Sequence, residues 1–129
     1  MATFKIAQNP TFNADVEIPR VGGEVIQVPF EFKYRDRKGL ASLFDSWELR
    51  LKNDQEALKA KGESLTIADT TASHIDYQVD QVQDIVAGWG FDDKFSPESI
   101  RALVETSAGA GNAIVKAYQD AYTPGRLGN

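Results

Sequence analysis

Few side chains in the sequence have the types and spacing that chemistry requires, and histidine is the first to consider. His74 is the only histidine, and the chain contains no cysteine. A zinc site of ordinary composition needs several histidine or cysteine ligands, and no serine–histidine–acid spacing is visible. We therefore interpret His74 as a surface or packing residue.

Two groups of aspartates could bind a cation or act in catalysis. Asp76, Asp80 and Asp84 recur every four residues, but calcium ligands usually come from a loop that ends in a bidentate glutamate. We interpret this row as a solvated acidic face, or as a patch that meets a basic partner. Asp92 and Asp93 lack a nearby nucleophile or oxyanion donor, so turn formation before a helix explains them better than catalysis.

Two further stretches suggest binding chemistry on first inspection. SAGAGNAIVK, residues 107–116, looks like a phosphate loop but lacks the lysine and hydroxyl at the required spacing. We predict that its small residues allow close helix packing. KYRDRK contains Lys33, Arg35, Arg37 and Lys38, which we interpret as a solvated corner between a strand and a helix. We therefore expect no enzyme activity and no metal or other cofactor.

Length and charge limit the function further. The chain has 129 residues, which suits one domain, and a net charge of −5, which argues against nucleic acid as a partner. No apolar run approaches the roughly 20 residues of a membrane span, so no membrane association is expected. MATFKIAQNP lacks the charged and apolar regions of a signal peptide. We expect a cytoplasmic protein.

The first 35 residues alternate between apolar and polar side chains, as β-strands do. One apolar face comprises Phe12, Ala14, Val16 and Ile18, and a second comprises Ile26, Val28, Phe30, Phe32 and Tyr34. A three-residue loop at 21–23 would set Ile18 opposite Ile26, so we predict this loop with a glycine at positive φ, or a bulge nearby. Phe4 and Ile6 are expected to add a short first strand.

Pro29 lies inside the second of these alternating runs. Proline cannot donate to a β-ladder, so this strand is expected to be an edge strand or to be bulged at that residue.

From Asp36 the apolar period becomes helical. A first helix should run to Lys61-Gly62, and a second from about Ala68 to near Gly88. Ser96-Pro97 is a strong start signal for a third helix, and Pro124-Gly125 should end the last one. The prediction is an α+β fold in a single domain, 1–129, with an antiparallel three-stranded meander over 1–35 and about four helices over 36–129.

The stretch AGWGFDDKFSPESI, residues 87–100, gathers three aromatic residues between two predicted helices. They can close the core where the helices meet, or they can stay exposed and bind an apolar partner segment. Three further residues, Leu49, Tyr77 and Tyr122, fall off the apolar stripes of their helices and strengthen the second interpretation. The predicted partner-binding residues are Leu49, Tyr77, Trp89, Phe91, Phe95 and Tyr122.

The C-terminal part of the chain resembles a known family in four short patterns. They comprise Val82, Asp84, Ile85, Gly88 and Trp89; Phe95, Ser96, Glu98 and Ile100; Ala113, Ile114, Ala117 and Tyr118; and Arg126 with Asn129. This half of the sequence resembles the tail assembly chaperones encoded by long-tailed bacteriophages and prophages, and the opening FKIAQNPTFNADVEIP looks like one subgroup of them.

The resemblance implies a non-enzymatic protein that binds the tape measure protein and keeps it soluble until the tail tube forms around it. It implies the tail tube protein as a second partner, action in the cytoplasm of the bacterial host, and absence from the mature virion. Self-association is a further expectation. The alternative is a structural virion protein, such as a tail-terminator or head–tail joining subunit, which assembles through a sheet edge.

Overall fold

The structure, a computed structural model, describes residues 3–123 and has the expected α+β architecture. The elements are β1 (Thr11–Pro19), β2 (Val25–Lys33), α1 (Arg37–Lys59), the 3-10 turn η1 (Gly62–Ser64), α2 (Ile67–Ile85), β3 (Val86–Trp89), α3 (Pro97–Thr106) and α4 (Ala110–Asp120). The α+β class, the antiparallel three-stranded sheet and the four helices are therefore confirmed. Pro124-Gly125, Arg126 and Asn129 lie outside the described residues.

The β1–β2 hairpin has the predicted register. Ile18 pairs with Ile26, and Phe12 pairs with Phe32. Gly22 and Gly23 have φ of 95° and 88°, and the Arg20 N–H donates to the Glu24 carbonyl at 2.7 Å to close a three-residue loop. The two apolar faces therefore meet, and both turn toward the helices.

The third strand is not the one expected from Phe4 and Ile6. Those residues form no strand, and the third strand is Val86–Trp89, so the sheet order is β1-β2-β3 with β2 in the centre. Local alternation placed the N-terminal strand beside residues 11–19, whereas the four residues after α2 pair with β2 on the opposite side of the sheet. Pairing between distant parts of the chain decides this, and local alternation does not report it.

The expectation that the strand containing Pro29 is an edge strand, or is bulged there, was also wrong. β2 is the central strand, and its irregularity lies between Glu31 and Phe32 on the side of β3. The Pro29 carbonyl accepts from the Gly90 N–H at 2.8 Å, so the missing N–H of Pro29 faces the place where β3 ends. A proline is tolerated at that position because few ladder bonds remain to be lost.

Two helices begin at the capping residues that the sequence provides. The Asp36 carboxylate accepts from the Gly39 N–H at 2.8 Å at the start of α1, and Ser96 caps α3 ahead of Pro97. The second helix ends at Ile85 rather than near Gly88, because Val86 becomes extended and pairs with Phe32.

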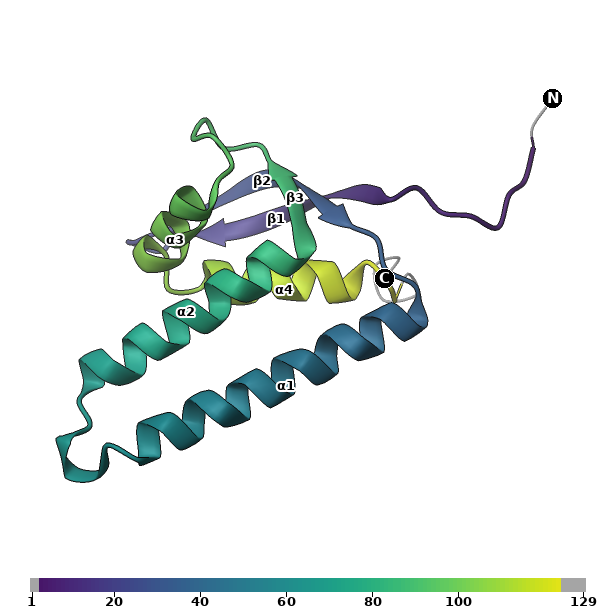
Figure 1. Ribbon diagram of the computed structural model, residues 1–129. Coiled ribbons are helices and arrows are strands. Elements are labelled where there is room, and N and C mark those ends of the chain that lie inside the picture. The colour runs from purple at the N-terminus through teal and green to yellow at the C-terminus, as the bar shows by residue number, and fades with distance from the viewer. Residues whose placement is uncertain (1–2, 124–129) are drawn as a thin grey trace.

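Figure 1 shows α4 lying along the sheet, while α1 and α2 form a long antiparallel hairpin that projects away from it. The core lies between the sheet and the helices and includes Phe30, Phe32, Val82, Ile85, Ile100, Ile114 and Tyr118. The helix α2 contacts α1 on one side and α3 and α4 on the other, so it needs two packing faces.

Candidate functional site

Trp89, Phe91 and Phe95 come together, and we call them the aromatic cluster. The ring centroid of Trp89 lies 5.0 Å from that of Phe91 and 5.1 Å from that of Phe95, both in edge-to-face geometry. All three residues are half-buried, and Trp89 also meets Phe30 of the core. The cluster therefore belongs partly to the core and partly to the surface.

Backbone contacts fix the position of Trp89 between its two glycines. The Trp89 Nε1–H donates to the Asp93 carbonyl at 2.8 Å, which closes the loop from β3 to α3. A Cβ atom on Gly90 would lie 2.6 Å from Pro29 Cγ, closer than packed atoms tolerate. Glycine at 90 thus allows the chain to pass against β2 directly after the tryptophan. Asp92 and Asp93 are exposed in this loop, consistent with the predicted turn.

Two cavities flank the aromatic cluster. One, of about 290 Å³, lies beside Trp89 and Phe91 and is also lined by Ala102 and Leu103 of α3. The other, of about 450 Å³, lies beside Phe95, with Val86, Ala87, Pro97 and Ile100 in its wall. The cavity beside Phe95 is lined mostly by apolar residues, whereas the cavity beside Trp89 is lined equally by apolar and polar residues, the latter being Arg20, Asp93, Ser99 and Thr106.

Leu49 and Tyr77 are placed differently from each other. Leu49 is 61% exposed on α1. Tyr77 is half-buried, and its hydroxyl donates to the Trp47 carbonyl at 3.2 Å, so the ring lies between α2 and α1. Burial, together with the Asp54 carboxylate, raises the pKa of Tyr77. The expectation that Tyr77 escapes burial was wrong, because α2 packs on α1 as well as on the core.

Tyr122 is also half-buried. Its hydroxyl accepts from the Arg35 backbone N–H at 3.0 Å and donates to the Tyr118 hydroxyl at 3.2 Å. Burial raises the pKa of Tyr122 well above the ordinary value, and the hydrogen bond with Tyr118 adds to the shift. The six predicted residues therefore do not form one site: three make the aromatic cluster, and Leu49, Tyr77 and Tyr122 lie elsewhere.

The acidic row on α2 is not simply a solvated face. Asp76 forms an ion pair with Arg101 of α3, and Asp80 forms one with Arg50 of α1. Asp84 accepts from the Trp47 Nε1–H at 2.8 Å. The row therefore connects α2 to the helices on either side.

The basic corner also has a structural role that the sequence pattern did not predict. Lys33 Nζ donates to the Gln83 carbonyl at 3.2 Å, and Arg35 Nη2 donates to the Asp84 carbonyl at 2.8 Å. These carbonyls lie in the last turn of α2, where cations are stabilised by the helix dipole and by open acceptors. Arg37 and Lys38 remain exposed, as predicted.

Close packing explains the glycine-rich stretch, as predicted. Ala110 and Gly111 are buried at the start of α4, and a Cβ on Gly111 would lie 2.7 Å from Gln78 Cδ. Small residues here let α4 approach α2.

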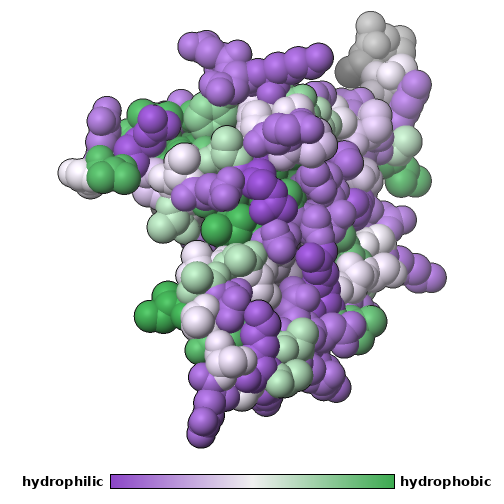
Figure 2. Space-filling view, turned by 60° about the vertical axis from the view of Figure 1, so that its left-hand side comes forward, coloured by the Kyte–Doolittle hydropathy of each residue, from purple (hydrophilic) through white to green (hydrophobic). Residues whose placement is uncertain are grey.

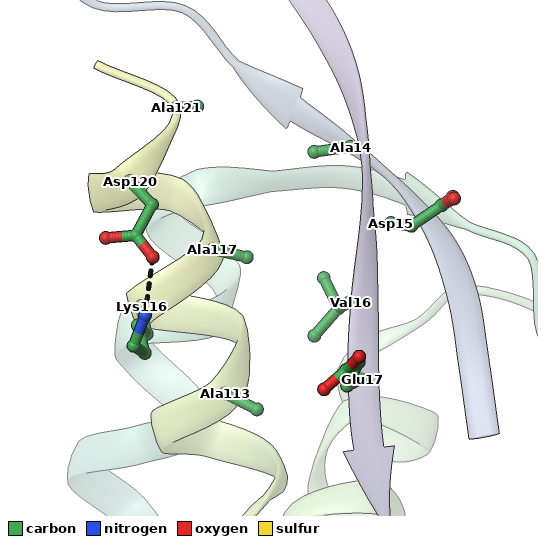
Figure 3. Close-up of a pocket in the computed structure, with 9 residues that line it drawn as sticks. All are labelled: Ala14, Asp15, Val16, Glu17, Ala113, Lys116, Ala117, Asp120 and Ala121. Carbon is green, nitrogen blue, oxygen red and sulfur yellow. Dashed lines mark hydrogen bonds and ion pairs between the residues drawn. The ribbon is translucent and has the colours of Figure 1, made fainter. Parts of the chain in front are cut away.

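One surface was not found from the sequence. A groove of about 470 Å³ lies between β1 and α4. Ala113 and Ala117 point into it from the helix, and Ala14 and Val16 point into it from the strand (Figure 3). The recurrence of alanine on α4 was the only signal, and it equally fits a buried stripe. Elsewhere, Figure 2 shows several small apolar patches among hydrophilic residues.

Within residues 3–123, His, Asp and Glu side chains do not gather in groups of three or more that could hold a metal ion. None of the helices in this range is long and apolar enough to span a membrane.

The fold and the site define a small α+β domain with a half-buried aromatic cluster that has a cavity on each side. The family model described as phage tail assembly chaperone matches residues 1–129, the whole chain, and the protein belongs to this family. No curated protein and no solved structure matched the chain.

Proposed function

We propose that this tail assembly chaperone binds the tape measure protein and keeps it soluble during tail assembly, without catalysing a reaction. The observation that carries the proposal is the half-buried aromatic cluster with a cavity on each side. Such a surface can accept the apolar face of an amphipathic helix, while a net charge of −5 keeps the complex soluble.

The contacts of each predicted residue suggest different roles in this binding. Trp89, Phe91 and Phe95 form the proposed centre, because their exposed edges line the two cavities. Leu49 offers an exposed side chain on α1 for an outlying contact. Tyr77 and Tyr122 line two separate hollows and are proposed as further outlying contacts through the ring surface that remains accessible. Several copies on one long client would bind by multivalency, so each contact can be weak.

Co-expression with the tape measure protein tests the proposal. We expect the tape measure protein to become soluble only as a complex with this chain. Phe95→Ser should reduce the co-purified amount several-fold, and Ile67→Ser should not, because Ile67 is 87% exposed at the start of α2, away from the cluster. Circular dichroism and urea unfolding establish that both variants remain folded.

Two results would refute the proposal. One is a tape measure protein whose solubility does not depend on this chain. The other is full binding by folded Phe95→Ser and Trp89→Ala variants, which would exclude the aromatic cluster as the binding site.

We further propose that the protein acts in the cytoplasm of the bacterial host, helps to recruit the tail tube protein, and is absent from the mature virion. Mass spectrometry of purified particles should detect tube and tape measure proteins but not this chain. Detection at stoichiometric amounts would support the structural-subunit alternative instead.

A further inference from the structure

The N-terminal arm, residues 3–9, extends away from the domain before β1 begins (Figure 1). Phe4 is 96% exposed and Ile6 is 100% exposed. In an extended chain these two side chains share one face, and Lys5 lies on the other. The arm therefore has the pattern of an amphipathic strand, and no residue within 3–123 of its own chain covers the apolar side.

The groove between β1 and α4 has a complementary pattern. Its floor is made of small side chains, Ala113 and Ala117 of α4 beside Ala14 of β1, as Figure 3 shows. On the strand, Asp15 and Glu17 alternate with Ala14 and Val16, and both acids also line the groove. If a further strand paired with β1 here, alternate side chains of that strand would lie over the alanines of the groove, and the side chains between them would lie beside Asp15 and Glu17.

The backbone of β1 is oriented to receive such a strand, because β1 lies at an edge of the sheet. The Tyr34 N–H donates to the Pro10 carbonyl at 2.8 Å. The even-numbered residues of β1 therefore direct their backbone N–H and C=O groups toward β2. Alternation then turns the N–H and C=O groups of Asp15 and Glu17 toward the free edge, where they can pair with an added strand.

The arm matches this edge in length, pattern and charge. Residues 3–9 span roughly 23 Å when extended, within the length of the nine-residue β1. With Phe4 and Ile6 over the alanines, Lys5 comes to lie on the face of Asp15 and Glu17. Lys5 is the only charged residue of the arm, and two acids on the receiving strand complement it.

The arm of the same chain is poorly placed to fill its own groove. It would have to reverse at Asn9-Pro10, but tight hairpin turns need positive φ, which Pro10 cannot adopt. The residue before a proline is held in extended conformations, so Asn9 favours a straight path into β1. These constraints favour an arm from another molecule.

We propose that the N-terminal arm of one copy binds as an added strand along β1 of a second copy, with Phe4 and Ile6 in the groove over α4. The occupant is a second copy of this chain, and the interaction does not depend on the tape measure protein.

Analytical ultracentrifugation of the full chain over a range of concentrations tests this self-association. We expect the wild type to assemble beyond the monomer, and Phe4→Ser/Ile6→Ser to weaken assembly at least tenfold through lost apolar burial. Asp15→Pro should also weaken it, because that position has its N–H on the free edge and not in the bond to β2. Val21→Ser is the matched control, since Val21 is 94% exposed in the hairpin loop outside the arm.

Cross-linking identifies whose arm fills the groove. The chain lacks cysteine, so a tagged Lys5→Cys chain and an untagged Asp15→Cys chain can be mixed and treated with a short bis-maleimide. We expect a product that joins the two chains, and none when Val21→Cys replaces Asp15→Cys. A wild type that stays monomeric, or a Lys5→Cys/Asp15→Cys chain that cross-links only within itself, would overturn the proposal. Because the assay contains this chain alone, its failure would leave the proposed chaperone function untouched.

Discussion

The indole N–H of Trp47 donates to the carboxylate of Asp84 at 2.8 Å and thereby joins α1 to the last turn of α2. The same turn is held on its other side by Arg35, which donates to the Asp84 carbonyl at 2.8 Å. Asp84 therefore connects α1 and the end of β2 to α2, close to the point where α2 becomes β3.

Trp47→Phe should destabilise the protein by about 2–3 kcal/mol, because it removes a hydrogen bond to a charged acceptor and some buried volume. Urea unfolding measures the change. Asp84→Asn keeps an acceptor for the indole N–H, so it should lower the free energy of unfolding by less than Trp47→Phe does. If Trp47→Phe lowers the free energy of unfolding by the same amount in the wild type and in an Asp84→Ala background, the hydrogen bond makes no contribution and the loss comes from packing alone.

The two glycines beside Trp89 should respond differently to alanine. In Gly90→Ala the new Cβ would lie 2.6 Å from Pro29 Cγ, and a proline ring cannot swing aside. We expect a loss of about 1–3 kcal/mol in the free energy of unfolding. Gly88→Ala is the matched control, because its Cβ meets only the end of the Glu31 side chain at 3.4 Å. It should change stability by less than about 1 kcal/mol in either direction. Equal effects at both positions would contradict the close approach to Pro29.

Local signals predicted much of the fold. The alternation around Ile18 and Ile26 was sufficient for the hairpin register, since any other register would put an apolar face opposite a polar one. The starts of α1 and α3 were predicted because Asp36 and Ser96 act on the next few residues of the chain.

Contacts between distant parts of the chain account for most of the predictions that were wrong. Val86 continues the helical spacing of Val79 and Val82, so nothing in the local pattern separates β3 from α2. Only its pairing with Phe32, more than fifty residues earlier in the chain, makes it a strand. The aromatic cluster was found because its three members are close in sequence. The burial of Tyr77 was missed because it depends on where α1 packs.

Tyr118→Phe should destabilise the protein by about 1–2 kcal/mol. Tyr118 is fully buried, and its hydroxyl donates to the Lys33 carbonyl at 2.8 Å while accepting from the Tyr122 hydroxyl. Without this oxygen, both the carbonyl and Tyr122 lose a partner in a region where water has little access. Urea unfolding measures the loss, with Tyr34→Phe as the control, because the Tyr34 ring contacts Tyr122 but its hydroxyl takes no part in these hydrogen bonds. A loss no greater than that of the control would show that the buried hydroxyl contributes little.

Stability should fall at alkaline pH, in part because of Tyr122. Burial raises the pKa of Tyr122 in the folded state above its unfolded value near 10. Above pH 10 the unfolded chain releases this proton while the folded chain retains it, so the unfolded state gains stability as the pH rises. The contribution is fully present below pH 10 and is lost progressively above it. Urea unfolding at pH 8 and pH 11 should therefore show a smaller loss for Tyr122→Phe than for the wild type. An identical loss would mean that Tyr122 ionises as easily in the folded chain as in the unfolded one.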